Sequence, residues 1–191
     1  MKRTLSTGLL VAFLALSFAA QASAEKLGYY FDFQNKTTAP WVGGSYIESP
    51  APVPPKGSSS VLGLQVAKDG NGYASLTDAG HDAVWMQAKF VPSANTMAIE
   101  FDATNVTNAG RLAPIIYVGA DAPKTLYDFQ LLGMPLENGP QHLQYEVSLK
   151  GISGAATNQF VNVAIGFMNL DRLTTTQVAG LDNIKVTIFD R

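Results

Sequence analysis

Apolar and polar side chains alternate with a period of two in several short segments of the chain. In residues 96–103, the alternate side chains from Met97 to Phe101 are apolar, whereas those between them are small or acidic. Segments 142–150 and 181–189 show the same alternation. A period of two places one face of a strand on an apolar core and the other face in water.

Clusters of Gly, Pro, Asn and Asp separate these segments, and no segment has a sustained helical period. The predicted strands are Leu27–Gln34, Val61–Ala67, Tyr73–Thr77, Ala83–Phe90, Thr96–Ala103, Ala113–Gly119, Leu126–Leu132, His142–Lys150, Phe160–Met168 and Leu181–Phe189. Closely spaced strands without intervening helices predict an all-β protein, an antiparallel β-sandwich of the jelly-roll type.

The N-terminus has the features of an export signal. A positively charged start is followed by an apolar run over residues 9–20 and by the small side chains of residues 22–24, which suit signal peptidase. The run is shorter than the roughly 20 residues that a membrane-spanning helix needs. We therefore expect a cleavable signal peptide over residues 1–24, one β-sandwich domain over residues 25–191, and no membrane anchor.

Composition narrows the partners of this domain. Removing 24 of the 191 residues leaves 167, with Lys2 and Arg3 lost, so 11 basic residues stand against 15 acidic ones and the net charge is −4. An acidic domain is a poor partner for nucleic acid or an anionic membrane surface. The absence of Cys excludes disulfides and a lipid anchor on cysteine. The sequence indicates a bacterial exported protein, secreted or periplasmic.

Catalytic signatures are scarce. The chain has two His residues, His81 and His142, so a zinc site built on several imidazoles is not expected. Both fit surface positions. Two carboxylates on polar strand faces, Glu100 and Asp128, are the candidates for the acid and base of a glycan-cleaving enzyme, provided that they lie about 5–9.5 Å apart.

Aromatic residues give a second candidate chemistry. In segment 83–90, Trp85 and Gln87 project from the face opposite the apolar one. An indole ring can stack on the C–H face of a sugar while neighbouring amides bind its hydroxyls, so we expect a ligand site at Trp85 and Gln87 that also includes Tyr117 and Gln130. The alternative is that Trp85 lies under a loop or in a seam between the two sheets. Trp41 either joins this site as a rim residue or anchors its loop to the core.

The two ends of the chain resemble a known family. The chain closes with residues 179–186 (AGLDNIKV) and opens, after the signal, with residues 30–33 (YFDF), followed by Trp41. This pattern resembles the jelly-roll carbohydrate-binding modules of bacterial exported enzymes. The resemblance implies that the first and last strands pair, with a possible structural calcium at Asp32 and Asp182. Family ligand sites lie on the concave sheet face or on edge loops, the second mapping here to Trp41 and Tyr46.

Three functional hypotheses follow. The first is a secreted, non-catalytic protein that binds a polysaccharide or glycoconjugate and needs no cofactor. The second is a small secreted glycan-cleaving enzyme that uses Glu100 and Asp128. The third is an extracellular surface or matrix protein that binds another protein or assembles with itself through exposed strand edges.

Overall fold

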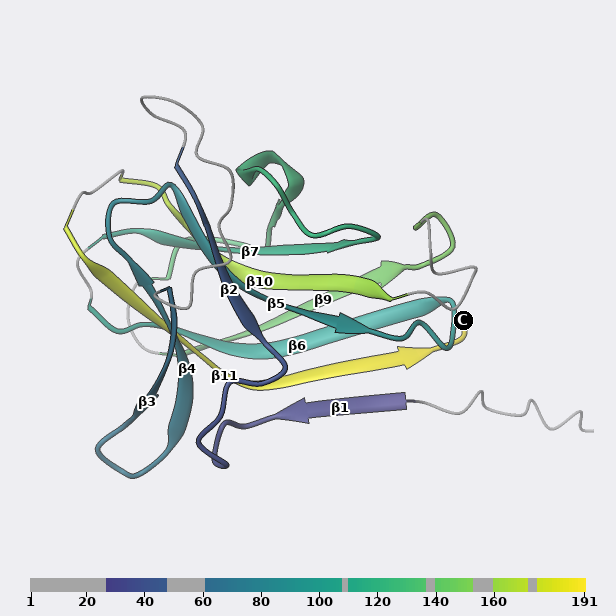
Figure 1. Cartoon of the computed structure of the whole chain (residues 1–191), viewed down its shortest axis with the longest axis horizontal. Coiled ribbons are helices and arrows are strands. Elements are labelled where there is room, and N and C mark those ends of the chain that lie inside the picture. The colour runs from purple at the N-terminus through teal and green to yellow at the C-terminus, as the bar shows by residue number, and fades with distance from the viewer. Residues whose placement is uncertain (1–26, 48–60, 108–109, 137–139, 153–159, 172–174) are drawn as a thin grey trace, which may run out of the picture.

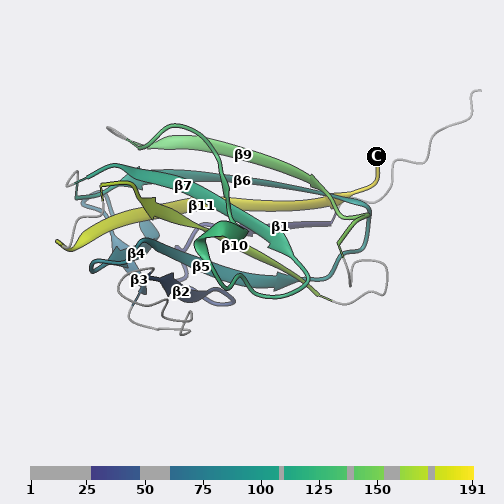
Figure 2. The ribbon, with the colours of Figure 1, turned by 90° about the horizontal axis from the view of Figure 1, so that it is seen from above.

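Two antiparallel sheets pack face to face in the computed structural model, which describes residues 27–47, 61–107, 110–136, 140–152, 160–171 and 175–191 (Figure 1). The six-stranded sheet has the order β3-β4-β11-β6-β9, and β1 also pairs with β11. The five-stranded sheet has the order β2-β5-β10-β7-β8. Figure 2 looks onto the face of the sandwich, with β7, β10 and β5 of the five-stranded sheet overlying strands of the six-stranded sheet. The predicted all-β sandwich is confirmed.

The elements have the following bounds. The strands are β1 (Leu27–Phe31), β2 (Val42–Tyr46), β3 (Leu62–Val66), β4 (Gly72–Asp78), β5 (Ala83–Phe90), β6 (Thr96–Asn105), β7 (Leu112–Gly119), β8 (Gln130–Leu131), β9 (Gln141–Ser148), β10 (Val161–Asn169) and β11 (Gln177–Phe189), and one 3-10 helix, η1, spans Leu126–Asp128.

The apolar faces that the alternation predicts form the layer between the sheets. Met97, Ile99 and Phe101 of β6 are fully buried there, as are Val186 and Ile188 of β11. Each sheet thus has an inner face on the core and an outer face. The outer faces of the two sheets are the surfaces available for binding.

Two local predictions are wrong. Residues 126–132 were expected to form one strand, but they form η1 and the two-residue β8. The Asp128 side chain accepts hydrogen bonds from the backbone N–H groups at the start of this turn, which favours a helical turn over a strand. Residues 39–44 were expected to form the loop that carries Trp41, but strand β2 begins at Val42. A Cβ at Gly44 would lie 2.5 Å from the Trp85 ring, so this strand needs glycine there.

Strand β11 changes partners halfway along its length. Its first part, to Leu181, pairs with β4, and its second part, from Ile184, pairs with β1, while β6 lies along its other side. The register with β6 shifts between Asp182 and Lys185, and Asn183 has a φ of 50°. This bulge turns Asp182 and Asn183 toward the outer face.

The predicted signal peptide, residues 1–24, lies outside the described residues. In the part of the chain that the structure describes, we find no helix with the length and apolar character needed to cross a membrane.

Candidate functional site

The outer face of the five-stranded sheet is closed by the segment that carries η1. Trp85 lies on this face, as the alternation predicts, but its side chain is 1% exposed. The ring of Phe129 covers it with centroids 5.0 Å apart, and Phe129 also packs against Tyr117. The expectation that Trp85 is exposed for stacking on a sugar is therefore wrong, because the connection after β7 folds back over the indole.

The other predicted neighbours of Trp85 serve this closed face or lie elsewhere. Gln87 accepts a hydrogen bond from the indole Nε1 at 3.1 Å. Tyr117 donates from its hydroxyl to the backbone oxygen of Asp121, and burial raises the pKa of this phenol. Gln130 lies in β8, where it accepts a hydrogen bond from Tyr145 of the other sheet at 2.9 Å. Trp85 and Gln87 line a shallow hollow of about 320 Å³ with residues 121–124, but Tyr117 and Gln130 lie outside it, so the four side chains do not form one site.

Trp41 is a core residue. Its side chain is 3% exposed, and its ring packs edge-on against Phe31 and Phe90, with centroids 5.4 and 5.9 Å apart. The predicted role of Trp41 at a binding rim is wrong because the ring fills the space between the sheets. Tyr46, the other residue of the edge-loop alternative, is 5% exposed in β2.

Glu100 and Asp128 do not form a catalytic pair. Glu100 lies on the outer face of the six-stranded sheet, where Lys185 approaches it at 3.5 Å. Asp128 lies in η1, which covers the outer face of the opposite sheet, so the whole sandwich separates the two carboxylates. Partial burial acts to raise the pKa of Asp128, but hydrogen bonds from Lys124 and Thr125 outweigh it and lower the pKa.

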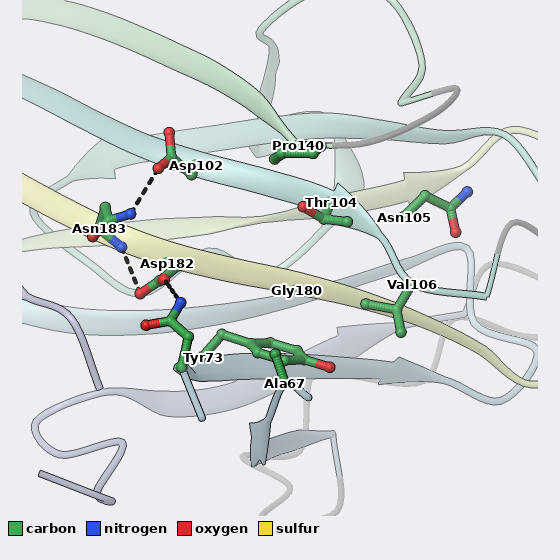
Figure 3. Close-up of a pocket in the computed structure, with 11 residues that line it drawn as sticks. Ala67, Tyr73, Asp102, Thr104, Asn105, Val106, Pro140, Gly180, Asp182 and Asn183 are labelled. Atoms are coloured by element: carbon green, nitrogen blue, oxygen red, sulfur yellow. Dashed lines mark hydrogen bonds between the residues drawn. The ribbon is translucent and has the colours of Figure 1, made fainter. Parts of the chain in front are cut away.

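The outer face of the six-stranded sheet, in contrast, is open and carries a hollow of about 610 Å³ (Figure 3). The hollow lies over β4, β11 and β6, beside the bulge in β11. The lining side chains that present polar or aromatic groups include Tyr73, Asp102, Thr104, Asn105, Asp182 and Asn183. We take this hollow and its rim as the candidate functional site.

Hydrogen bonds fix the polar side chains around the bulge. Asn71 donates from Nδ2 to Asp182 at 2.7 Å, and the backbone N–H of Asn183 donates to the same carboxylate at 2.8 Å. The Asn183 side chain donates to Asp102 at 2.8 Å and accepts from the hydroxyl of Tyr30 at 2.7 Å. The bulge therefore links β1, β6 and the turn before β4 through planar side chains whose orientations are set.

The same network reaches the edge of the sheet. Asp102 lies opposite His142 of β9, and its second oxygen is 2.8 Å from the imidazole Nδ1. Gln144 lies 3.2 Å from the other ring nitrogen. A row of hydrogen-bonding groups thus runs across the sheet from Tyr30 to Gln144. Such a row offers donors and acceptors to a ligand that carries many hydroxyl groups.

Tyr73 supplies an aromatic surface to the hollow. Its hydroxyl donates to Gln65 at 2.8 Å, and its ring lies against Gly180 of the neighbouring strand. A Cβ at Gly180 would come within 2.9 Å of a Tyr73 ring carbon, so the glycine lets the ring lie close to the sheet. Figure 3 shows Tyr73 on the same side of the sheet as Asp102 and Asn183.

Negative charge is concentrated at the bulge. Burial raises the pKa of Asp182, and the charges of Asp102 and Asp32 raise it further, while the hydrogen bonds from Asn71 and Asn183 act in the opposite direction. The structure thus brings Asp32 near Asp182, as the pairing of the first and last strands implies. Among the described residues, however, no three His, Cys, Asp or Glu side chains gather at a metal-binding distance. Calcium at this pair stays a prediction, and nothing below depends on it.

Sequence reasoning assigned Asn183 no part in a glycan site and did not connect Asp102 with His142. One signal was present: Leu181 and Ile184 are both buried, although a regular strand would place residues three apart on opposite faces. This break in the period of two marks an extra residue, hence a bulge. The contact between Asp102 and His142 depends on the pairing of β6 with β9, which no local pattern reveals.

Comparison with known proteins identifies the fold. No protein-family model and no curated protein matches the sequence. Among solved structures, the CBM22-1 xylan-binding domain from Paenibacillus barcinonensis Xyn10C is similar over 88% of this chain and 97% of that one, with a TM-score of 0.57 and 10% identity. The chain has the fold of a carbohydrate-binding module.

Two further solved structures share this fold. TmCBM61 in complex with beta-1,4-galactotriose has a TM-score of 0.51 and 7% identity, over 81% of this chain and 92% of that one. The K3 cleaved adhesin domain of Lys-gingipain from Porphyromonas gingivalis W83 has a TM-score of 0.51 and 14% identity, over 86% of this chain and 99% of that one. The expected likeness to carbohydrate-binding modules is therefore confirmed at the level of the fold.

Proposed function

We propose that this protein is an exported, non-catalytic glycan-binding protein whose ligand lies on the open face of the six-stranded sheet. The observation that supports this proposal most strongly is the row of oriented polar groups from Tyr30 through Asn183 and Asp102 to His142, beside the ring of Tyr73. Fixed amides and carboxylates suit hydroxyl groups, and an aromatic ring suits the C–H face of a sugar.

The fold adds independent support, because solved structures with this architecture include a xylan-binding domain and a complex with galactotriose. Shared architecture alone does not determine function, so the proposal depends on the site. The open face is the better location for the ligand because the opposite face is covered by Phe129 and η1.

A glycan-array screen of the purified protein, followed by calorimetric titration of the strongest hit, tests the proposal. Tyr73→Ala should weaken the affinity at least tenfold, which corresponds to about 1.4 kcal/mol. Tyr127→Ala is the matched control, since this tyrosine is 72% exposed over the opposite sheet. It should leave the affinity unchanged.

Three results would contradict the proposal. If no glycan binds, the assigned function is wrong. If Tyr127→Ala abolishes binding whereas Tyr73→Ala does not, the assigned face is wrong. Incubation of the same glycan with the protein should release no new reducing ends, and release that survives substitution of Glu100 by Gln and of Asp128 by Asn would point to catalysis by other groups.

A further inference from the structure

Strand β9 ends the six-stranded sheet. Among the described strands it pairs with β6 alone, in one unbroken register from Gln141 opposite Ala103 to Ser148 opposite Thr96. Figure 2 shows β9 at the margin of the two layers. In an antiparallel strand, alternate residues direct their N–H and C=O groups away from the paired neighbour, so β9 presents a row of backbone donors and acceptors at this edge.

β9 lacks several of the features that usually protect an edge strand from pairing, and its one acidic side chain, Glu146, is already paired with Arg191. It is eight residues long and contains no Pro, Gly or Lys. The edge strand β8, by comparison, has two residues, and β3 has five. Short length, Pro, Lys and bulges are the devices by which sheet edges avoid association. The β9 edge is therefore suited to accept another strand.

The core-facing side chains of β9 are incompletely buried. Leu143, Tyr145 and Val147 pack against the main core, yet each stays partly exposed. The corresponding apolar residues of the neighbouring β6 are fully buried. An additional strand beside β9 would remove more of this apolar surface from water, which favours association.

We propose that β9 pairs antiparallel with β9 of a second copy of this chain, with Tyr145 opposite Tyr145 at the two-fold axis. On the core side, Leu143 then lies opposite Val147, so the facing rows are apolar. On the outer side, Gln144 lies opposite Glu146, and an amide N–H can donate to a carboxylate.

The register with its axis at Tyr145 is favoured over the register with its axis at Gln144. With the axis at Tyr145, His142 lies opposite Ser148, whose hydroxyl can donate to a ring nitrogen. Moving the axis to Gln144 would instead place the amide of Gln141 opposite the apolar Val147. Glu146 already contacts Arg191 at 2.6 Å, and a carboxylate has further acceptor positions for the amide of the second copy.

Antiparallel pairing keeps the outer faces of the two sheets on one side, because residues opposite each other project from the same face. A dimer formed through β9 would therefore present both hollows beside the bulge on a single continuous surface. The dimer does not depend on the proposed ligand. If both proposals hold, one polysaccharide chain can engage two sites, which raises the effective affinity.

Sedimentation velocity over a range of protein concentrations tests the dimer without any glycan. Gln144→Glu places like charges opposite each other twice in the proposed register and should raise the dissociation constant of the dimer at least tenfold. Combining Gln144→Glu with Glu146→Gln restores the donor–acceptor pairs and should return the constant to within about threefold of the original. Gln65→Glu, the same change on the edge strand β3, should have no effect.

Because the chain has no Cys, engineered thiols test the register separately. Tyr145→Cys places two thiols at the axis, within the reach of a disulfide, and should cross-link on mild oxidation. Ser148→Cys should still dimerise but should form no disulfide, since the partner of this residue is His142 and the two new thiols lie far apart. A wild-type protein that is monomeric at every concentration, a Gln144→Glu variant that dimerises normally, or equal cross-linking of both Cys variants would overturn the proposal.

Discussion

The two outer faces of the sandwich contain similar residue types but differ in what covers them. On the five-stranded sheet, Trp85 lies beneath Phe129 and is withdrawn from solvent, and the half-buried Tyr117 packs against the same Phe129 ring. On the six-stranded sheet, Tyr30 and Tyr73 stand beside fixed carboxylates and amides, and an open hollow lies over β4, β11 and β6. The difference teaches that the strand period assigns a side chain to a face, whereas the connections decide whether that face is open.

The largest expected effect concerns the closed face. Trp85→Ala removes a ring that is 1% exposed, and we expect it to lower the free energy of unfolding by about 3–5 kcal/mol. Tyr73→Ala, on the open face, should cost less than half as much. Urea denaturation of both variants checks this. Equal losses would contradict the contrast between a packed face and a binding face.

The contrast also shows how far sequence alone reaches. Alternation predicted the sandwich and the core sides of β6 and β11, because burial of one strand face imposes that period. It also placed Trp85 on the correct side of β5. It did not reveal the cover over Trp85, since that depends on η1, a turn held by the hydrogen bonds of Asp128.

The candidate site was less predictable than the fold. Asp102 and Asn183 are far apart in the sequence and meet because β6 lies beside β11. Strand order is a property of the whole fold, so the period of two carries no information on it. One part of the site does have a local sequence signal. The apolar residues Leu181 and Ile184 are three apart, and this break in the period of two predicts the bulge.

Packing of Trp85 against β2 gives the next largest effect. A Cβ at Gly44 would lie 2.5 Å from two atoms of the Trp85 ring, so Gly44→Ala should destabilise the protein by about 1–3 kcal/mol through overpacking. Gly28→Ala in β1 is the control, because no atom lies within 4 Å of the added Cβ. A cost at Gly44 no larger than at Gly28 would mean that the closed face is loosely packed.

The bulge on the open face should have a conformational cost of its own. Asn183 has a φ of 50°, which glycine adopts freely and alanine does not. Both Asn183→Gly and Asn183→Ala lose the hydrogen bonds to Tyr30 and Asp102. Alanine should therefore cost about 1–2 kcal/mol more than glycine in urea denaturation. Equal stability of the two variants would show that the left-handed conformation is not retained.

The smallest expected effects are stability changes of opposite sign when one carboxylate on each face is neutralised. The pKa of Asp182 is raised from its ordinary value of 3.8, so its ionised form is disfavoured in the folded protein. Asp182→Asn should therefore increase stability at pH 7, by less than about 1 kcal/mol, the scale of exposed charge interactions. In the wild type, protonation of Asp182 gives the same gain in stability below pH 3.8. This gain is lost as the pH rises through the pKa of Asp182 in the folded protein.

Asp128 on the covering segment should behave in the opposite way. Its pKa is lowered despite partial burial, because the N–H groups of Lys124 and Thr125 and the Thr125 hydroxyl hydrogen-bond to its ionised form. Asp128→Asn should therefore reduce stability at pH 7. The wild-type advantage should disappear as pH falls from 3.8 through the folded pKa. Urea denaturation across this pH range measures both variants. If Asp182→Asn also destabilises the protein at pH 7, the hydrogen bonds from Asn71 and Asn183 outweigh the burial and the like charges at the bulge. Hydrogen bonds would then stabilise the ionised carboxylate on both faces.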